Sequence, residues 1–174
     1  MRKINWGIIG LGAIAQKFSE AFTDAKNSNL LAIASHDYQK LENFRKKFDI
    51  DQKFIFKNYE DLLNCKDIDI IYIALPNSLH FHWVMKSIEN NKNILVEKPA
   101  TLKFEEAENI KQSLLNKDLF FGEAFMYRYH PQIKYVLDTI KSNEIGNIES
   151  MESLFGINIL TKKKFLFFEK KKEN

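Results

Sequence analysis

The chain opens with the segment Ile4-Asn-Trp-Gly-Ile-Ile-Gly-Leu-Gly-Ala-Ile-Ala15, in which an apolar run breaks into a glycine turn. Gly10 lets a strand bend sharply, and Gly12 leaves no Cβ between the backbone N–H groups and an anion that comes close. Ala15 is small enough for a following helix to pack against the strand. The segment therefore predicts a strand–turn–helix unit that binds the diphosphate of a dinucleotide.

The expected helix starts directly after this turn. Its first residues, Ala13 and Ile14, offer the anion backbone N–H donors and the partial positive charge of a helix N-terminus. Phe18 and Phe22 continue the helix as an apolar stripe. An ordinary strand–helix turn without a ligand is the alternative interpretation of the same pattern.

The composition limits the class of protein. The 174 residues carry a net charge of +3, and much of the positive charge lies in Lys162–Lys164 and Lys170–Lys172. A nearly neutral body argues against a nucleic-acid partner. Cys65 is the one cysteine, so an intramolecular disulfide is excluded and a reducing cytoplasm is the expected compartment. The apolar runs are too short to span a bilayer, so we expect no membrane partner.

Short apolar runs alternate with helical stripes along the chain. We expect strands at Ile4–Ile9, Leu30–Ala34, Phe54–Phe56, Ile68–Ala74, Asn93–Val96 and Leu119–Phe125. We expect helices at about Ala13–Asp24, Tyr38–Phe48, Tyr59–Asn64, Leu79–Asn90 and Phe104–Asn116. Strands rich in Ile, Leu and Val that alternate with helices pair in parallel and are covered on both faces. The predicted fold class is α/β, with a doubly wound parallel (Rossmann) sheet.

Polar residues mark two of the helix starts. Ser78 is a candidate N-cap for the fourth helix. Thr101, followed by Glu105 and Glu106, predicts an acidic first turn for the fifth helix.

Three polar segments follow predicted strands at the ends where ligands bind, because the carboxyl ends of parallel strands meet at one rim of a sheet. The segments are Ala74-Leu-Pro-Asn-Ser-Leu-His80, Leu95-Val-Glu-Lys-Pro-Ala100 and Gly122-Glu-Ala-Phe-Met-Tyr-Arg-Tyr-His-Pro131. We therefore expect their side chains to converge on one site, although they lie far apart in the sequence.

Together with the glycine turn, these segments resemble the Gfo/Idh/MocA family of oxidoreductases. The motifs are Pro76-Asn-Ser-Leu-His80, Glu97-Lys98-Pro99 and Glu123-Ala-Phe-Met-Tyr-Arg-Tyr-His-Pro-Gln132. The resemblance runs from about Lys3 to Ile159, and the last motif is most similar to the branch of sugar and dihydrodiol dehydrogenases. It implies NAD(P)-dependent hydride transfer between a nicotinamide coenzyme and a hydroxyl of a small sugar, polyol or dihydrodiol substrate.

The resemblance implies that Lys98 is the catalytic residue. A lysine held beside a coenzyme can steady a developing alkoxide or polarise a carbonyl. The alternative for Lys98 is a side chain that lies along the surface or pairs with Glu97. Expected coenzyme contacts are Gly10, Gly12, Ala13, Ile14, Ala15, Ser35, His36, Leu75, Pro76, Asn77, His80, Glu97 and Lys98, and the expected substrate-pocket residues are Glu123, Tyr127 and Arg128.

The other histidines near these motifs have less direct roles. His82 follows His80 by two residues, about 200° further round a helix, so it is expected to face solvent. This spacing also argues against a metal site. His130 precedes Pro131, so it either shapes the pocket entrance or begins the next helix.

The residues after the second strand bear on the choice of coenzyme. NAD-binding proteins usually place Asp or Glu there, where it binds the ribose 2′-hydroxyl. This chain has Ser35-His36-Asp37, so no acid stands directly at the strand end. Ser35 and His36, with Lys40 nearby, suit a 2′-phosphate if Asp37 turns outward as a helix cap. We therefore expect NADP in preference to NAD, although both fit the pattern.

We expect a full domain followed by the start of another. The Rossmann domain spans residues 1–122, a partial α+β substrate domain spans 123–160, and a basic, irregular tail spans 161–174. The partial domain supplies a helix near Gln132–Ser142 and a strand from Asn147 to about Ile159. Members of the family are usually much longer, so the resemblance implies a chain that is truncated on its C-terminal side.

The expected truncation bears on activity and on association. No histidine follows His130, so the second-domain histidine that exchanges the substrate proton in the family has no counterpart in this sequence. The alternatives are an impaired oxidoreductase and a dinucleotide-binding module without activity. An open strand edge at Ser150–Ile159 and the apolar Phe165–Phe168 predict self-association.

Overall fold

The computed structural model describes residues 2–154 and 156. The chain divides into two compact units, Met1–Met126 and Tyr127–Asn174, and each is described by itself. Within the described part of the chain, every helix falls short of the length and apolar character that crossing a membrane requires.

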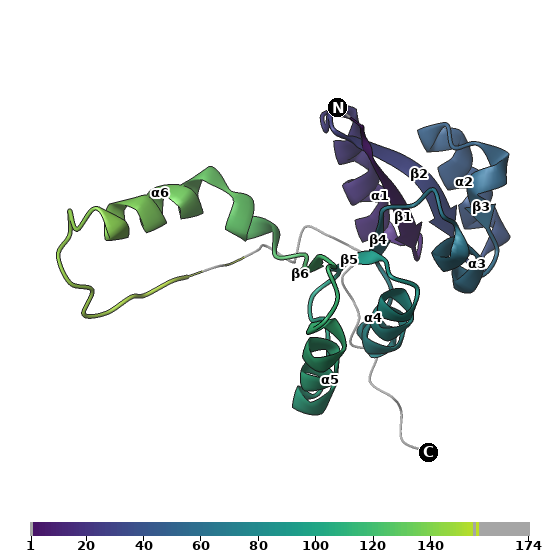
Figure 1. The fold of residues 1–174 in the computed structure, drawn as a ribbon. Coiled ribbons are helices and arrows are strands. Elements are labelled where there is room, and N and C mark those ends of the chain that lie inside the picture. The colour runs from purple at the N-terminus through teal and green to yellow at the C-terminus, as the bar shows by residue number, and fades with distance from the viewer. Residues whose placement is uncertain (1, 155, 157–174) are drawn as a thin grey trace, which may run out of the picture. The chain divides into compact units, whose positions relative to one another are not determined.

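The first unit is built around a sheet of six parallel strands (Figure 1). In spatial order these are β3 (Ile55–Phe56), β2 (Ser28–Ala34), β1 (Ile4–Ile9), β4 (Ile70–Ile73), β5 (Asn93–Val96) and β6 (Phe121–Glu123). The strand order reverses between β1 and β4, which is the switch point of a doubly wound sheet. The predicted α/β Rossmann class is therefore confirmed.

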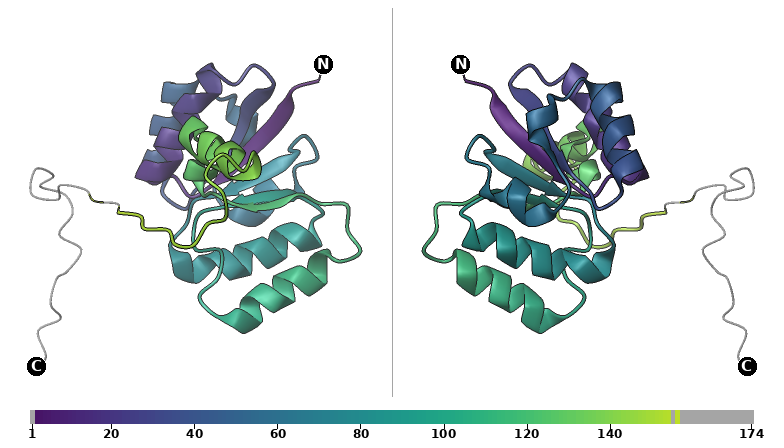
Figure 2. Two further views of the ribbon diagram at one scale, coloured as in Figure 1. Left: turned by 90° about the vertical axis from the view of Figure 1, so that its left-hand side faces the viewer. Right: turned by 90° about the vertical axis from the view of Figure 1, so that its right-hand side faces the viewer.

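Helices connect the strands and cover both faces of the sheet (Figure 2). Their bounds are α1 (Ala13–Glu20), α2 (Tyr38–Phe48), α3 (Tyr59–Asn64), α4 (His80–Glu89) and α5 (Phe104–Leu114), and short 3₁₀ helices form η1 (Ala21–Thr23), η2 (Gln52–Phe54) and η3 (Asn77–Leu79). Helices α1 and α2 pack on one face, and α3, α4 and α5 pack on the other.

Each face of the sheet buries its own apolar cluster. Ile8 and Tyr72 face α1 and α2, whereas the neighbouring residues Ile9 and Ile73 face α3, α4 and α5. Successive residues of a strand point to opposite faces, so a sheet covered on both faces needs unbroken apolar runs. Those runs are the pattern that predicted these strands.

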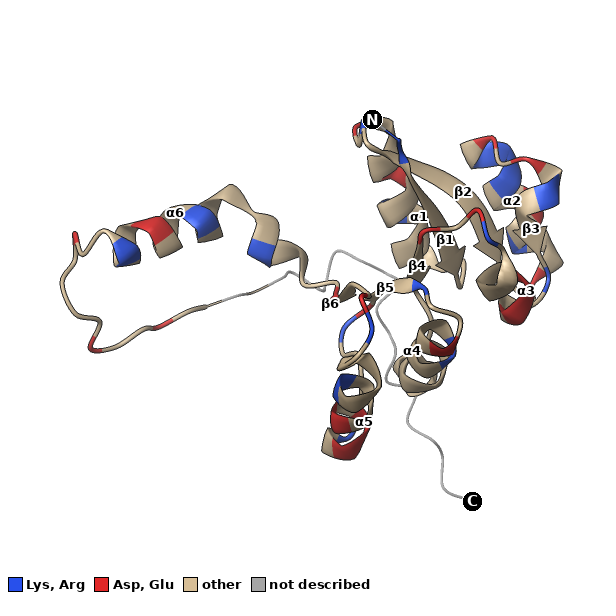
Figure 3. Ribbon diagram, in the orientation of Figure 1, with Lys and Arg blue, Asp and Glu red and all other residues tan. Residues whose placement is uncertain are grey.

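Charge is kept off most of the sheet. Strands β1 to β5 contain no charged residue, while α2 and α5 each carry both signs (Figure 3). Helix α3 carries the acidic residues Glu60 and Asp61 without a basic residue, so the mixture of signs belongs to α2 and α5.

The two predicted helix caps differ from those in the structure. Ser78 lies inside η3, and α4 begins after Leu79 without a side-chain cap, so the N-cap prediction for Ser78 is wrong. Helix α5 is preceded by Lys103 rather than Thr101, but its acidic first turn is confirmed. The Glu106 carboxylate accepts a hydrogen bond from the backbone N–H of Leu102 at 3.0 Å. This contact holds the backbone that precedes the helix.

The second unit contains η4 (Met126–Tyr129), which straddles the boundary, and α6 (Pro131–Lys141). His130 begins α6 as its N-cap, because its Nδ1 accepts the N–H of Gln132 at 3.2 Å. The prediction of a strand from Asn147 is wrong over residues 147–154, because these residues form no strand. A strand is held by pairing with a neighbour, and sequence pattern alone does not provide one. The rest of that expected strand, Phe165–Phe168 and the basic tail lie outside the described residues.

Candidate coenzyme site

The strand ends that carry the expected site lie in one row. Across the sheet, the paired residues are Ala34, Ile9, Ile73, Val96 and Glu123. The predicted segments therefore leave the sheet next to one another along a single rim. Ligands of doubly wound sheets bind at this rim, beside the switch point.

The glycine turn leaves β1 at the centre of the rim. Gly10 has a φ of +88°, and a Cβ placed there would lie 2.6 Å from the carbonyl oxygen of Ala74. Only glycine fits this bend without moving the neighbouring backbone. A Cβ placed on Gly12 would meet no atom within 4 Å, so the space before α1 is open. Ala15 is fully buried, as close packing of α1 on the strand requires.

The open space faces the start of α1. Gly12 is the N-cap of α1 and provides no side-chain cap. The first intrahelical bond runs from the N–H of Gln16 to the carbonyl of Gly12 at 3.1 Å. The preceding N–H groups, of Ala13, Ile14 and Ala15, have no acceptor within the helix. Such a cradle fits a diphosphate, because it combines free donors, open space and the positive end of the helix dipole.

The end of β2 confirms one expected detail. The Asp37 carboxylate caps α2 by accepting the N–H of Lys40 at 3.1 Å, and the Lys40 amine lies 3.6 Å from the same carboxylate. The acid is thus engaged by its own helix, as predicted. It is not presented by the strand end in the manner of an NAD-binding carboxylate.

His36 and Ser35 stand in its place. His36 is exposed, its Nδ1 lies 3.0 Å from the carbonyl oxygen of Lys57, and its ring lies 4.5 Å from that of Tyr59. A carbonyl can only accept, so Nδ1 is the donor and Nε2 is left for a ligand. The buried Ser35 hydroxyl accepts the N–H of Asp37 at 3.1 Å and keeps its own proton to donate.

Lys98 lies on the rim after β5 and is exposed. Within the described part of the chain it makes no hydrogen bond or ion pair, so the alternative in which it pairs with Glu97 is not what the structure shows. The peptide bond that joins it to Pro99 is cis. Lys98 therefore presents a free amine at the place where the resemblance puts the catalytic residue.

The residues on both sides of Lys98 are held. Tyr72 donates its hydroxyl to Glu97 Oε1 at 2.5 Å, and the backbone N–H of Ala100 donates to Glu123 Oε1 at 2.8 Å. Burial, and then the hydrogen bond and charge of Glu97, raise the pKa of Tyr72. The phenol therefore stays a donor to the carboxylate.

His80 lies beneath the rim, fully buried at the start of α4. Its Nδ1 lies 2.7 Å from the carbonyl oxygen of Pro99, and its Nε2 lies 2.8 Å from that of Leu75. Both polar atoms of the ring are thus engaged by backbone. Pro76 and Asn77 are exposed on the loop that Leu75 begins, and His82 faces solvent, as expected.

The sequence did not predict these supporting contacts. Tyr72 was assigned only to an apolar strand, although a tyrosine among isoleucines needs a partner for its hydroxyl. The hydroxyl of a tyrosine in a buried strand was the signal in the sequence that could have predicted a polar partner for Tyr72. Among the substrate-pocket predictions, Glu123 contacts Ala100, whereas Tyr127 and Arg128 are exposed residues of the second unit.

Residues 4–125 match the family described as the oxidoreductase family with an NAD-binding Rossmann fold. The chain belongs to the Gfo/Idh/MocA family. Its relatives include trans-1,2-dihydrobenzene-1,2-diol dehydrogenase of Xenopus tropicalis, which is 29% identical over 156 residues, or 88% of this chain and 47% of that protein. The chain spans about half the length of the curated relatives it matches.

Solved structures of the family share the fold. KijD10, a 3-ketoreductase of Actinomadura kijaniata in complex with NADP and TDP-benzene, superimposes with a TM-score of 0.74 at 29% identity, over 82% of this chain and 43% of that one. Scyllo-inositol dehydrogenase of Lactobacillus casei, with bound NAD(H) and scyllo-inositol, superimposes with a TM-score of 0.77 at 24% identity. The match covers 84% of this chain and 43% of that one.

Proposed function

We propose that this protein is an NAD(P)-dependent oxidoreductase that transfers hydride between a nicotinamide coenzyme and a hydroxyl-bearing carbon of a small sugar, polyol or dihydrodiol. The observation that carries the proposal is the free amine of Lys98, exposed on the rim while its neighbours Glu97 and Pro99 are anchored. The names of the relatives, a dihydrodiol dehydrogenase, a 3-ketoreductase and an inositol dehydrogenase, support this substrate class.

The residues of the rim divide the work between binding and proton transfer. When bound, the nicotinamide ring supplies the hydride acceptor or donor. The Gly10–Gly12 turn and the first N–H groups of α1 hold the diphosphate. In the oxidation direction, Lys98 takes the hydroxyl proton of the substrate as the C–H electron pair leaves as hydride, so a carbonyl forms. In the reverse direction the ammonium of Lys98 returns that proton to the oxygen.

We propose NADP as the preferred coenzyme. The carboxylate of Asp37 is engaged by the start of α2, so it competes poorly for a ribose hydroxyl. The hydroxyl of Ser35 offers a donor in its place, and the amine of Lys40 adds positive charge nearby. This arrangement favours the 2′-phosphate over the 2′-hydroxyl, because charge-assisted hydrogen bonds to phosphate are strong.

A dinucleotide-binding module without turnover is the second candidate. It is favoured by the placement of the glycine turn and Lys98 in the first unit, whereas the expected substrate-pocket residues Tyr127 and Arg128 belong to the second unit. In that case the chain would bind the coenzyme and leave sugars unchanged. We also propose a reducing, cytoplasmic compartment, because the sequence contains a single cysteine.

Turnover by a Lys98→Ala variant tests the proposed chemistry. We expect oxidation of a panel of sugars, polyols and dihydrodiols to fall by at least about a hundredfold, with NADPH binding retained. Lys103→Ala is the matched control, since Lys103 is also exposed and lies five residues further along the same connection. Binding without turnover in the wild type supports the module, and turnover that survives in Lys98→Ala contradicts the role of Lys98.

A further inference from the structure

The imidazole of His80 joins two loops of the rim. Its nitrogens face the carbonyl oxygens of Pro99 at 2.7 Å and of Leu75 at 2.8 Å. Leu75 follows β4 and Pro99 follows β5, and these strands are neighbours in the sheet, with Ile73 paired to Val96. The ring is fully buried, so both contacts are shielded from water.

The chemistry of the two acceptors makes this junction specific. Backbone carbonyls can only accept hydrogen bonds, so a ring nitrogen that faces one of them is held there when it donates its N–H. A rigid ring also fixes the separation of its two nitrogens, and with it the separation of the two loops. A buried carbonyl without a donor costs free energy, so the folded state favours the loop spacing at which both carbonyls face the ring.

We propose that His80 is a positioning residue that sets the spacing between the Leu75–Asn77 loop and Lys98 at the rim of the sheet. The inference rests on the proposed function and on the expectation that Leu75, Pro76, Asn77 and Lys98 contact the nicotinamide end of the coenzyme. His80 acts from behind them through their carbonyls and leaves the exposed sides of both loops to the ligand.

The surrounding contacts support a role in positioning rather than in general stability. The segment around Lys98 is held at Glu97 by Tyr72, at Pro99 by His80 and at Ala100 by Glu123. Of these contacts, the one through His80 also reaches the neighbouring loop. Loss of His80 should therefore change the distance between the two loops, and we expect the start of α1 at Gly12, which shares none of these contacts, to stay unchanged.

The chain contains a matched control at the opposite end of the sheet. Lys92 immediately precedes β5 and is buried, and its amine donates to the carbonyls of Cys65 at 2.6 Å and of Ile68 at 3.0 Å. Like His80, it bridges two backbone carbonyls from a buried position. Lys92→Met removes such a bridge far from the rim, so it reports the effect of lost stability alone.

The test compares two ligands by calorimetry on the full chain. NADPH has the nicotinamide ring, whereas 2′-phospho-ADP-ribose keeps the adenine, both riboses and the diphosphate but lacks that ring. In His80→Gln and His80→Phe we expect NADPH to bind at least about tenfold more weakly and the ring-less ligand to bind within about twofold of wild type. Lys92→Met should lower the melting temperature and leave the ratio of the two affinities unchanged.

A second measurement tests the junction without any ligand. Hydrogen exchange at the amides of Leu79 and Ala100, which donate to the Pro76 carbonyl and to the Glu123 carboxylate, should become faster in His80→Gln and stay unchanged in Lys92→Met. The proposal is overturned if His80→Gln weakens both ligands in parallel, if it leaves NADPH binding intact, or if exchange at these amides is unchanged. A wild-type chain that binds neither ligand would contradict the proposed function, and the exchange result would still decide the role of His80.

Discussion

At the scale of single residues, Gly10 and Gly12 have different roles although they are only two positions apart. A side chain at Gly10 would collide with the backbone of Ala74, whereas a side chain at Gly12 would enter open space. The first position is therefore required by the fold, whereas we propose that the second is kept open for the ligand. Substitutions at the two positions should separate stability from binding.

For Gly12→Asp we expect an intact fold and lost binding. Aspartate is a favourable N-cap, so the free energy of unfolding should be unchanged or raised by a few tenths of a kcal/mol, about 0.3. Its carboxylate would lie where the diphosphate binds, so the Kd for NADPH should rise at least about a hundredfold. Gly12→Asn introduces a neutral side chain of similar size and is the control, and it should lose less affinity for NADPH. Wild-type affinity in Gly12→Asp would contradict the cradle.

Tyr72 gives the molecule a predicted dependence on alkaline pH. Burial and the Glu97 carboxylate raise the pKa of Tyr72 above the ordinary tyrosine value of 10.0. Above that value the unfolded chain loses the phenolic proton while the folded chain keeps it, so this contribution to stability is present below about pH 10 and lost as pH rises further.

Urea unfolding of the wild type and Tyr72→Phe checks this prediction. At pH 8 the wild type should be more stable by about 1.5 kcal/mol, because a hydrogen bond to a charged group is lost in the variant. The difference should shrink as the pH is raised from 10 to 11. A difference that stays constant over this range would show that Tyr72 is not held as a phenol by Glu97.

At the scale of elements, the start of α2 depends on one side chain. The Asp37 carboxylate accepts the N–H of Lys40 and is the side-chain cap of that helix. Asp37→Ala should therefore lower the free energy of unfolding by about 1 kcal/mol, while Asp37→Ser, which keeps a capping oxygen, should lose less. Thermal unfolding followed by circular dichroism measures both. Equal melting temperatures for Asp37→Ala and wild type would rule out this cap.

The elements also show what the sequence could predict. Apolar runs located all the strands, because a sheet covered on both faces needs them. The start of α4 was predicted to within one residue, but its Ser78 cap was wrong, because the backbone forms a 3₁₀ turn at Asn77–Leu79 before the helix begins at His80. Rim residues such as Lys98 were predicted from strand ends. The contact of Tyr72 with Glu97 was not, because it joins residues 25 positions apart and depends on packing between strands.

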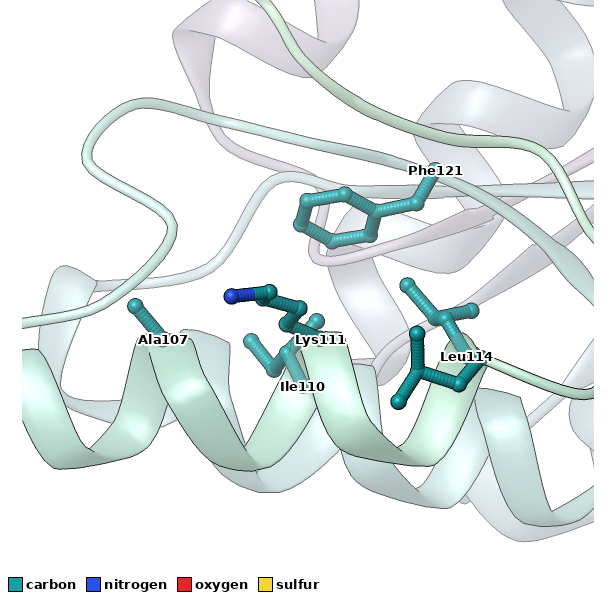
Figure 4. Close-up of a pocket in the computed structure, with 6 residues that line it drawn as sticks. Ala107, Ile110, Lys111, Leu114 and Phe121 are labelled. Atoms are coloured by element: carbon teal, nitrogen blue, oxygen red, sulfur yellow. The ribbon is translucent and has the colours of Figure 1, made fainter.

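At the scale of the whole molecule, the first unit ends in an open sheet edge. Strand β6 is the outermost strand, and beside it the side chains of Leu115 and Phe120 are 62% and 52% exposed. A pocket of about 380 Å³ opens here, lined by Ala107, Ile110, Lys111, Leu114, Leu115 and Phe121 (Figure 4). We propose that this edge also takes part in the predicted self-association, since Phe165–Phe168 and part of the strand first expected to do so lie outside the described residues.

Light scattering with size-exclusion chromatography tests this assignment. We expect the wild type to associate as its concentration rises, and Phe120→Lys to shift the population toward monomer, because charge on an edge opposes pairing. Phe120→Leu, which keeps an uncharged apolar side chain at the same position, is the control and should not shift it. A strictly monomeric wild type at high concentration would contradict the prediction.

The central claim is that the turn after β1 cradles the diphosphate of a nicotinamide coenzyme. Isothermal titration of the folded chain with NADPH and with NADH tests it most directly. We predict saturable binding with one coenzyme per chain, tighter for NADPH than for NADH. A chain shown to be folded by circular dichroism that binds neither coenzyme at millimolar concentration would contradict it.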